Sequence, residues 1–247
     1  MFEEHNEGFV WGDVKRVHNF ERRAVMNQES RKAEIERMLD QVEDEKLKAQ
    51  IIKGLKYLDD PARHLHVTYG ISMSRAGGYE ELALKFAQLA YEQNPEDCYF
   101  LLELCSSLRQ PQEVVDAIEQ FLGRVELHSL PKDQQAKMTV TLATGYREIG
   151  KVSESIKTLE ESRGELARGT EILAELYYET GCPQKAIDLL FERLKYMGKL
   201  SDDMASCMGK SFDALGDYSE AVGMLAKFKD DEPIKSLHEE MEGKIRR

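Results

Sequence analysis

The segment from Met208 to Pro233 constrains the fold of this chain more than any other stretch of the sequence. Apolar or small residues recur at steps of three and four positions before Gly216, and the same spacing resumes after it. Such spacing places the residues on one face of a helix, and a glycine followed by aspartate is typical of a helix end. The segment therefore predicts two short helices folded against each other at a glycine turn, with Gly209 and Ala221 where the two backbones approach.

A single helical pair cannot bury its apolar face, so the same pattern is expected elsewhere in the chain. Residues 134–162 and 168–197 repeat the spacing closely, and residues 62–95 and 96–126 repeat it more loosely. The predicted turns lie at Gly77, Arg109, Gly150, Gly181 and Gly216, at intervals of 32, 41, 31 and 35 residues. These intervals scatter about the roughly 34-residue period of a helix-turn-helix repeat, and the surplus falls in an irregular connection at residues 126–132.

The repeated segments resemble tetratricopeptide repeats. That family combines leucine followed by glycine or alanine, a tyrosine, a turn glycine, a second apolar helix and a final proline. The match is close for 205–233, good for 137–162 and 170–194, loose for 62–95 and poor for 96–126. The resemblance implies an all-α fold, a superhelical solenoid of about five helix-turn-helix repeats over residues 61–233.

The sequence on either side of the repeats predicts two helical extensions. Residues 1–60 are interpreted as an arm followed by an amphipathic helical hairpin, with a basic amphipathic helix from 13 to 27 and a turn near Val42 to Lys46. Residues 234–247 place Ile234, Leu237, Met241 and Ile245 on one helix face. This last helix is expected to cap the apolar side of the final repeat.

Composition and charge argue against several classes of ligand. The formal net charge of −12 disfavours a nucleic-acid backbone or an anionic membrane surface as the main partner. No segment reaches the roughly 18 to 20 apolar residues of a membrane span, and the N-terminus does not resemble a secretory signal. The four cysteines lack the spacing of a zinc site or a disulfide framework, so we expect reduced apolar helix residues in a cytoplasmic protein.

No catalytic, cofactor or metal site is predicted. His64 and His66 are two positions apart, so on a helix they point in different directions and cannot hold one metal ion. His238 lacks the second histidine of a zinc protease helix, and the serine-x-x-lysine match at Ser129 lies in a connection without accompanying motifs. Phosphate-binding glycine motifs are also missing. The expectation is a chain without enzymatic activity.

The tetratricopeptide resemblance implies that the first helix of each pair lines a concave face and that its exposed residues touch a partner. The candidate binding residues at these positions are Tyr99, Glu103, Lys137, Thr144, Arg147, Arg168, Glu171, Glu175, Tyr178, Glu179 and Lys210. Some family members clamp a partner's terminal carboxylate with lysine, asparagine and arginine, but these rows lack that set of lysine and asparagine. The acidic row of Glu171, Glu175 and Glu179 favours a partner segment that carries lysine or arginine; a solvated helix face is the alternative.

Two functional hypotheses follow from these patterns. The first is an adaptor or scaffold that binds a peptide or protein surface in the concave groove and helps assemble a complex. The second is self-assembly into a homo-oligomer, in which the basic segment at residues 13–37, or the candidate docking arm Phe9, Val10 and Trp11, packs into the groove of the same or another copy.

Overall fold

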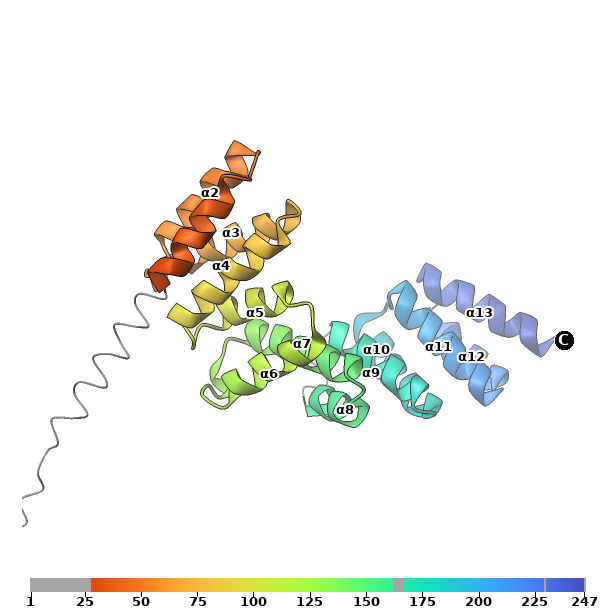
Figure 1. Ribbon diagram of the computed structural model, residues 1–247. Helices are drawn as coiled ribbons and strands as arrows, with labels where there is room; N and C mark the ends of the chain where they lie inside the picture. The colour runs from red at the N-terminus through yellow and green to blue at the C-terminus, as the bar shows by residue number, and fades with distance from the viewer. Residues whose placement is uncertain (1–27, 162–166, 229, 247) are drawn as a thin grey trace, which may run out of the picture. The chain divides into compact units, whose positions relative to one another are not determined.

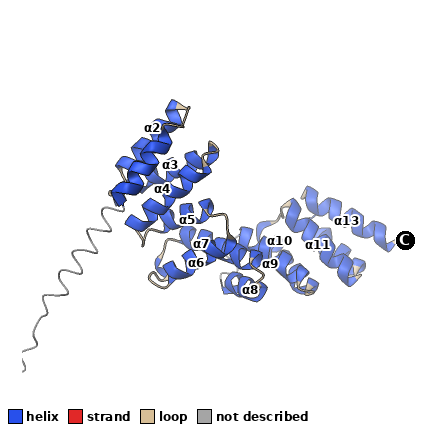
Figure 2. Ribbon diagram, in the orientation of Figure 1, coloured by secondary structure: helices blue, strands red, loops and turns tan. Residues whose placement is uncertain are grey.

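The computed structural model in Figure 1 describes residues 28–161, 167–228 and 230–246. All regular secondary structure in these ranges is helical, as Figure 2 shows, so the all-α prediction is confirmed. Phe9, Val10 and Trp11 and the basic segment at residues 13–27 lie outside the described residues. None of the described helices is long and apolar enough to cross a membrane.

The chain divides into two compact units, Met1–Leu108 and Arg109–Arg247. The first contains a helix described over residues 28–39, α2 (Glu45–Lys56), α3 (His64–Ala76), α4 (Glu80–Gln93) and α5 (Cys98–Ser107), with the short 3-10 helix η1 (Pro61–Arg63) before α3. The second contains α6 (Pro111–Leu122), η2 (Leu127–Ser129), α7 (Lys132–Glu148), α8 (Val152–Glu161), α9 (Ala167–Glu179), α10 (Pro183–Met197), α11 (Asp202–Leu215), α12 (Tyr218–Leu225), η3 (Ala226–Phe228) and α13 (Glu232–Ile245).

Local sequence signals explain where many of these helices begin and end. The carboxylate of Asp44 accepts hydrogen bonds from the backbone N–H of Lys46 at 2.8 Å and of Leu47 at 3.1 Å, which satisfies donors at the start of α2. Pro111 and Pro183 each occupy the first turn of a helix, where the missing N–H costs little. Gly181 and Gly216 end α9 and α11 in the left-handed conformation, with φ of 76° and 73°.

Two glycine assignments made from sequence need correction. The left-handed residue of the first turn is Gly78, with φ of 83°, whereas Gly77 has an ordinary φ of −79°. Gly209 does not mark a close approach to Ala221. A side chain at Gly209 would instead meet Leu237 Cδ1 of α13 at 2.8 Å, so the absent side chain makes room for the C-terminal helix.

In the first unit, the N-terminal hairpin packs directly on the first repeat-like pair. Its turn lies at residues 40–44, near the predicted Val42 to Lys46. Glycines allow close packing here, because a Cβ at Gly54 would lie 2.9 Å from the backbone oxygen of His66. Lys85 of α4 pairs with Glu34 at 2.9 Å, and Arg31 pairs with Glu92, so the hairpin's first helix is held against α4.

The second unit has a continuous apolar core that runs from α7 to α13. Its buried members include Leu176, Leu190, Phe212, Leu225 and Met241. The predicted capping helix is α13, which packs on α11 and α12, and Figure 1 shows it beside them at the C-terminal end. The residues predicted as the second repeat, 96–126, contain the boundary between the units, with α5 packed on α3 and α4, and α6 packed on α7.

Candidate functional site

A hollow of about 230 Å³ lies on the first helices of three successive pairs in the second unit, α7, α9 and α11. It is lined by Arg147, Glu175, Tyr178, Glu179, Asp203, Ser206, Cys207 and Lys210. We call it the acidic hollow. Five of the residues predicted for the concave face, Arg147, Glu175, Tyr178, Glu179 and Lys210, meet in it.

Arg147 links two of the helices that form the acidic hollow. Its guanidinium donates hydrogen bonds to Glu175 at 2.8 Å and to Glu179 at 2.5 Å, one helix turn apart on α9. Burial lowers the pKa of Arg147, but the two carboxylate hydrogen bonds outweigh this and raise it overall. The arginine therefore stays charged and fixes α7 against α9.

A similar link occurs in the first unit, and we call this contact between an arginine of one first helix and two side chains of the next first helix the arginine tie. Arg75 of α3 donates to Glu103 at 3.1 Å and to Ser107 at 3.2 Å on α5, at sequence separations of 28 and 32 residues. Arg147 reaches Glu175 and Glu179 at the same separations. Both arginines stand three positions before a left-handed glycine, so the tie recurs at one position of the repeat.

Negative charge is incompletely balanced beside the acidic hollow. Burial raises the pKa of Glu171 above its ordinary value of 4.5, and the charges of Asp203 and Glu175 raise it further, while Arg168 opposes the shift. Carboxylates this close disfavour one another's ionised form. A cationic group placed among Glu171, Glu175 and Asp203 would relieve that repulsion.

Cys207 supplies an apolar wall rather than a reactive group. Burial raises the pKa of its thiol to about 11, and the charge of Glu175 adds to the shift. The thiol is therefore protonated at neutral pH and a poor nucleophile. The sequence interpretation treated Cys207 only as a core residue and missed its place in the hollow.

The other predicted site residues lie outside the acidic hollow. In the first unit, the ring of Tyr99 stacks on His64 with centroids 4.8 Å apart, and Glu103 is held by Arg75. Lys137 and Arg168 are exposed, and Thr144 is half-buried on α7.

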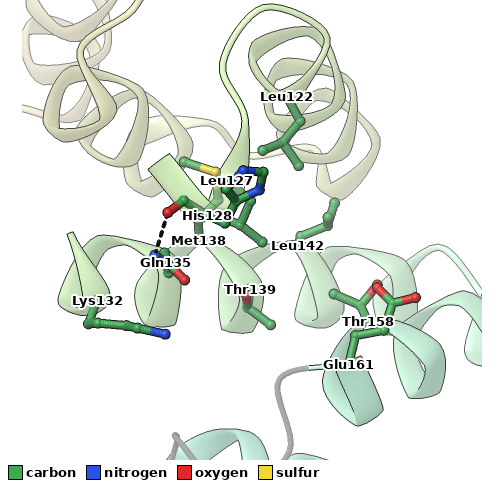
Figure 3. A pocket seen from close by; sticks show the side chains of 10 residues that line it. All are labelled: Leu122, Leu127, His128, Lys132, Gln135, Met138, Thr139, Leu142, Thr158 and Glu161. Carbon is green, nitrogen blue, oxygen red and sulfur yellow. Dashed lines mark hydrogen bonds between the residues drawn. The ribbon is translucent and has the colours of Figure 1, made fainter. Parts of the chain in front are cut away.

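A second hollow, of about 400 Å³, was not predicted from sequence. Figure 3 shows Leu122, Leu127, Met138 and Leu142 facing it, with His128, Lys132 and Glu161 at its edge. It lies where the connection of residues 126–132 lengthens the repeat interval. The Gln135 side chain braces this connection by donating to the backbone oxygens of Leu130 at 2.6 Å and of His128 at 3.3 Å, the latter drawn in Figure 3.

The described residues contain no cluster of histidine, cysteine, aspartate or glutamate suited to a metal ion. The rings of His64 and His66 contact different partners, Tyr99 and Tyr57 respectively.

Comparison with known proteins identifies the fold. One solved structure, of a putative kinesin light chain from Podosopora anserina with nearly identical TPR-like repeats, is 17% identical, covers 72% of this chain and 95% of that chain, and superposes with a TM-score of 0.54. A crystal structure of MamA is 16% identical, covers 65% of this chain and 86% of that chain, and has a TM-score of 0.52. No family model and no curated protein matches the sequence. The structural likeness confirms the helix-turn-helix repeat solenoid predicted from the tetratricopeptide pattern.

Proposed function

We propose that this chain, which has a tetratricopeptide-repeat solenoid fold, is a non-catalytic cytoplasmic scaffold that binds a basic peptide or protein segment in the acidic hollow and so helps assemble a complex. The observation that carries the proposal is the meeting of Arg147, Glu175, Tyr178 and Asp203 on three successive first helices, α7, α9 and α11. Repeat proteins of this architecture present such faces to partners.

The chemistry of the hollow supports a basic occupant. Three acidic and two basic residues line it, and one of the bases, Arg147, is already held by two carboxylates. Glu171 adds a further carboxylate, whose pKa is raised first by burial and then by repulsion from Asp203 and Glu175. A lysine or arginine from a partner would therefore be attracted to this end of the hollow. Tyr178, partly buried against the core, offers an aromatic surface for the rest of the segment.

Affinity capture from native cytoplasm tests the proposal when wild type and variants are compared side by side. We expect Glu175→Lys and Tyr178→Ala to lose the proteins that the wild type enriches, without a change in helical content. Glu239→Lys and Tyr196→Ala are matched controls at exposed positions outside the hollow, and they should retain those proteins. An unchanged set of captured proteins in both hollow variants would contradict the proposal.

Charge complementarity also favours a second candidate function, self-assembly through the N-terminal segment. That segment carries Lys15, Arg16, Arg22 and Arg23, and the groove of another copy offers the acids just described. Light scattering on the full chain and on a chain lacking residues 1–27 tests this candidate. A mass above that of the monomer for the full chain, but not for the shortened chain, would support it. Monomer masses for both chains would rule out the intermolecular form.

A further inference from the structure

A further hollow, of about 500 Å³, adjoins the acidic hollow and has the C-terminal helix as one wall. It lies between α11 and α13 and is lined by Asp202, Ala205, Ser206, Glu232, Pro233, Ser236, Leu237 and Glu240. Ser206 lines both hollows, so they are neighbours along α11. We call it the C-terminal hollow.

The C-terminal hollow combines apolar and acidic surface. Ala205, Pro233 and Leu237 supply apolar atoms. Among the described residues that line it, Asp202, Glu232 and Glu240 are acidic and none is basic. This composition suits an occupant with an apolar side chain beside a cationic one.

Two bases of α13 already pair with acids that line this hollow: Lys235 contacts Glu232 at 3.2 Å, and Lys244 contacts Glu240. Lys244 of α13 contacts Asp213 at 2.5 Å and Glu240 at 2.8 Å, and the hydrogen bonds to these two carboxylates raise its pKa. Asp213 lies on α11, so this ion pair also ties α13 to its neighbour. Glu240 shares Lys244 with Asp213, and three acids line the hollow against these two bases, so its rim keeps a net negative charge that attracts a further cation.

We propose that α13 is a binding element as well as a cap, and that one basic, extended segment of a partner protein occupies the acidic hollow and the C-terminal hollow together. The inference rests on the proposed function, because the first anchor of the segment sits in the acidic hollow. It adds a second anchor point and a direction, from α9 across α11 to α13.

Helix spacing sets the distance between the two anchors. Neighbouring packed helices lie about 8–10 Å apart, so the centres of successive grooves differ by a similar distance. A polyproline II segment rises about 3.1 Å per residue with three residues per turn, so positions i and i+3 lie on one face about 9 Å apart. The partner motif is therefore two apolar-basic anchors separated by about three residues.

Two fluorescein-labelled peptides with a proline-rich host sequence provide the test on the full chain. One carries a single leucine-arginine anchor, and the other carries two such anchors about three residues apart. Fluorescence anisotropy should show that the second peptide binds about tenfold or more tightly than the first, because the second anchor binds at high effective concentration.

Substitutions on α13 identify where the second anchor binds. Glu240→Arg and Ser236→Arg should each abolish the gain from the second anchor while the single-anchor peptide binds as before. Ser236 is exposed and takes no part in the Lys244 ion pairs, so it separates lost binding from a loosened helix. Glu239→Arg makes the same charge change one residue away, outside the lining, and should keep the gain.

The possible results distinguish a failure of this inference from a failure of the proposed function. A gain that survives in both α13 variants would overturn this inference and leave the proposed function standing. Binding of neither peptide to the wild type would contradict both. A synthetic peptide of residues 13–27 serves as a third probe. If it binds more tightly than the two-anchor peptide and shows the same dependence on α13, the occupant is a second copy of this chain, and our assignment to a partner protein is wrong.

Discussion

The two units use the same arginine tie with different charge balance. In the first unit Arg75 contacts one carboxylate and one hydroxyl, those of Glu103 and Ser107. In the second unit Arg147 contacts two carboxylates, those of Glu175 and Glu179. The geometry of the tie is thus a packing feature of the repeat, and the additional carboxylate is specific to the second unit.

The exposed surfaces of the first helices also differ in polarity between the two units. On α3, Leu65 and Tyr69 are 66% and 50% exposed and lie one helix turn apart on one face. On α9 and α11, by contrast, Glu175, Glu179 and Asp203 line the acidic hollow. In the first unit one acid accompanies the arginine of the stack, so we assign the surplus acids of the second unit to the proposed partner site.

Charge reversal at equivalent positions of the two units should give the largest difference in peptide affinity. We expect Glu175→Lys to weaken binding of the single-anchor basic peptide by about a hundredfold, because it removes an attractive charge and adds a repulsive one. Glu103→Lys, the equivalent change in the first unit, should leave that affinity unchanged. Anisotropy titrations measure both, with thermal unfolding as a check on folding. Equal losses in the two variants would contradict a site confined to the second unit.

Removal of each arginine separates packing from binding. Arg147→Ala and Arg75→Ala should each lower the free energy of unfolding by about 1 kcal/mol, as expected for partly exposed ion pairs. Arg147→Ala alone should also raise affinity for the basic peptide by about threefold, because two carboxylates lose their internal cation. Urea denaturation and anisotropy give the two quantities. Weaker peptide binding by Arg147→Ala would show that the arginine itself contacts the peptide.

Acidification should weaken peptide binding through Glu171. Its pKa in the folded chain is raised, and a bound cation would lower it, so affinity should fall severalfold as pH drops through the raised value toward 4.5. Without peptide the sign is opposite. The folded chain holds the proton on Glu171 more tightly than the unfolded chain, so protonation of this residue stabilises the fold. Loss of peptide at low pH would therefore not be explained by unfolding caused by Glu171. Titrations across this range should show a smaller pH dependence for Glu171→Gln, and an identical dependence would exclude Glu171 from the effect.

An added carboxylate beside Arg75 in the first unit should have the smallest effect, and the effect should be on the free energy of unfolding. Ser107→Glu would give Arg75 the same two-carboxylate environment as Arg147 and should raise the free energy of unfolding by no more than about 0.5 kcal/mol. Thermal and urea unfolding at low and high salt measure it, since the gain should diminish as salt screens the pair. A clear destabilisation would mean that the hydroxyl of Ser107, which also donates to the Glu103 backbone oxygen at 2.9 Å, cannot be replaced.

Turn glycines and helix patterns were predictable from sequence because they act locally. Gly150, Gly181 and Gly216 adopt the predicted turn conformation, and only Gly was compatible with their positive φ without strain. At the first turn either of two adjacent glycines could serve. Gly78 takes the left-handed position, and Gly77 packs where a Cβ would meet Leu47 at 2.9 Å.

Contacts between helices could be predicted only in part, because they depend on packing register. The resemblance placed Arg147, Glu175 and Glu179 on one face, but their ion pairs require the alignment of α7 with α9. The contact of Gly209 with Leu237 depends in turn on the position of α13. The separations of 28 and 32 residues from both Arg75 and Arg147 were present in the sequence and would have revealed the repeated tie.

Amide hydrogen exchange of the full chain, with and without the single-anchor basic peptide, tests the central claim most directly. If the surplus acids of the second unit form the binding site, the peptide should slow exchange in α9 and α11 and leave α3 and α5 unchanged. Slower exchange confined to α3 and α5, or the same exchange throughout the chain at saturating peptide, would contradict the account.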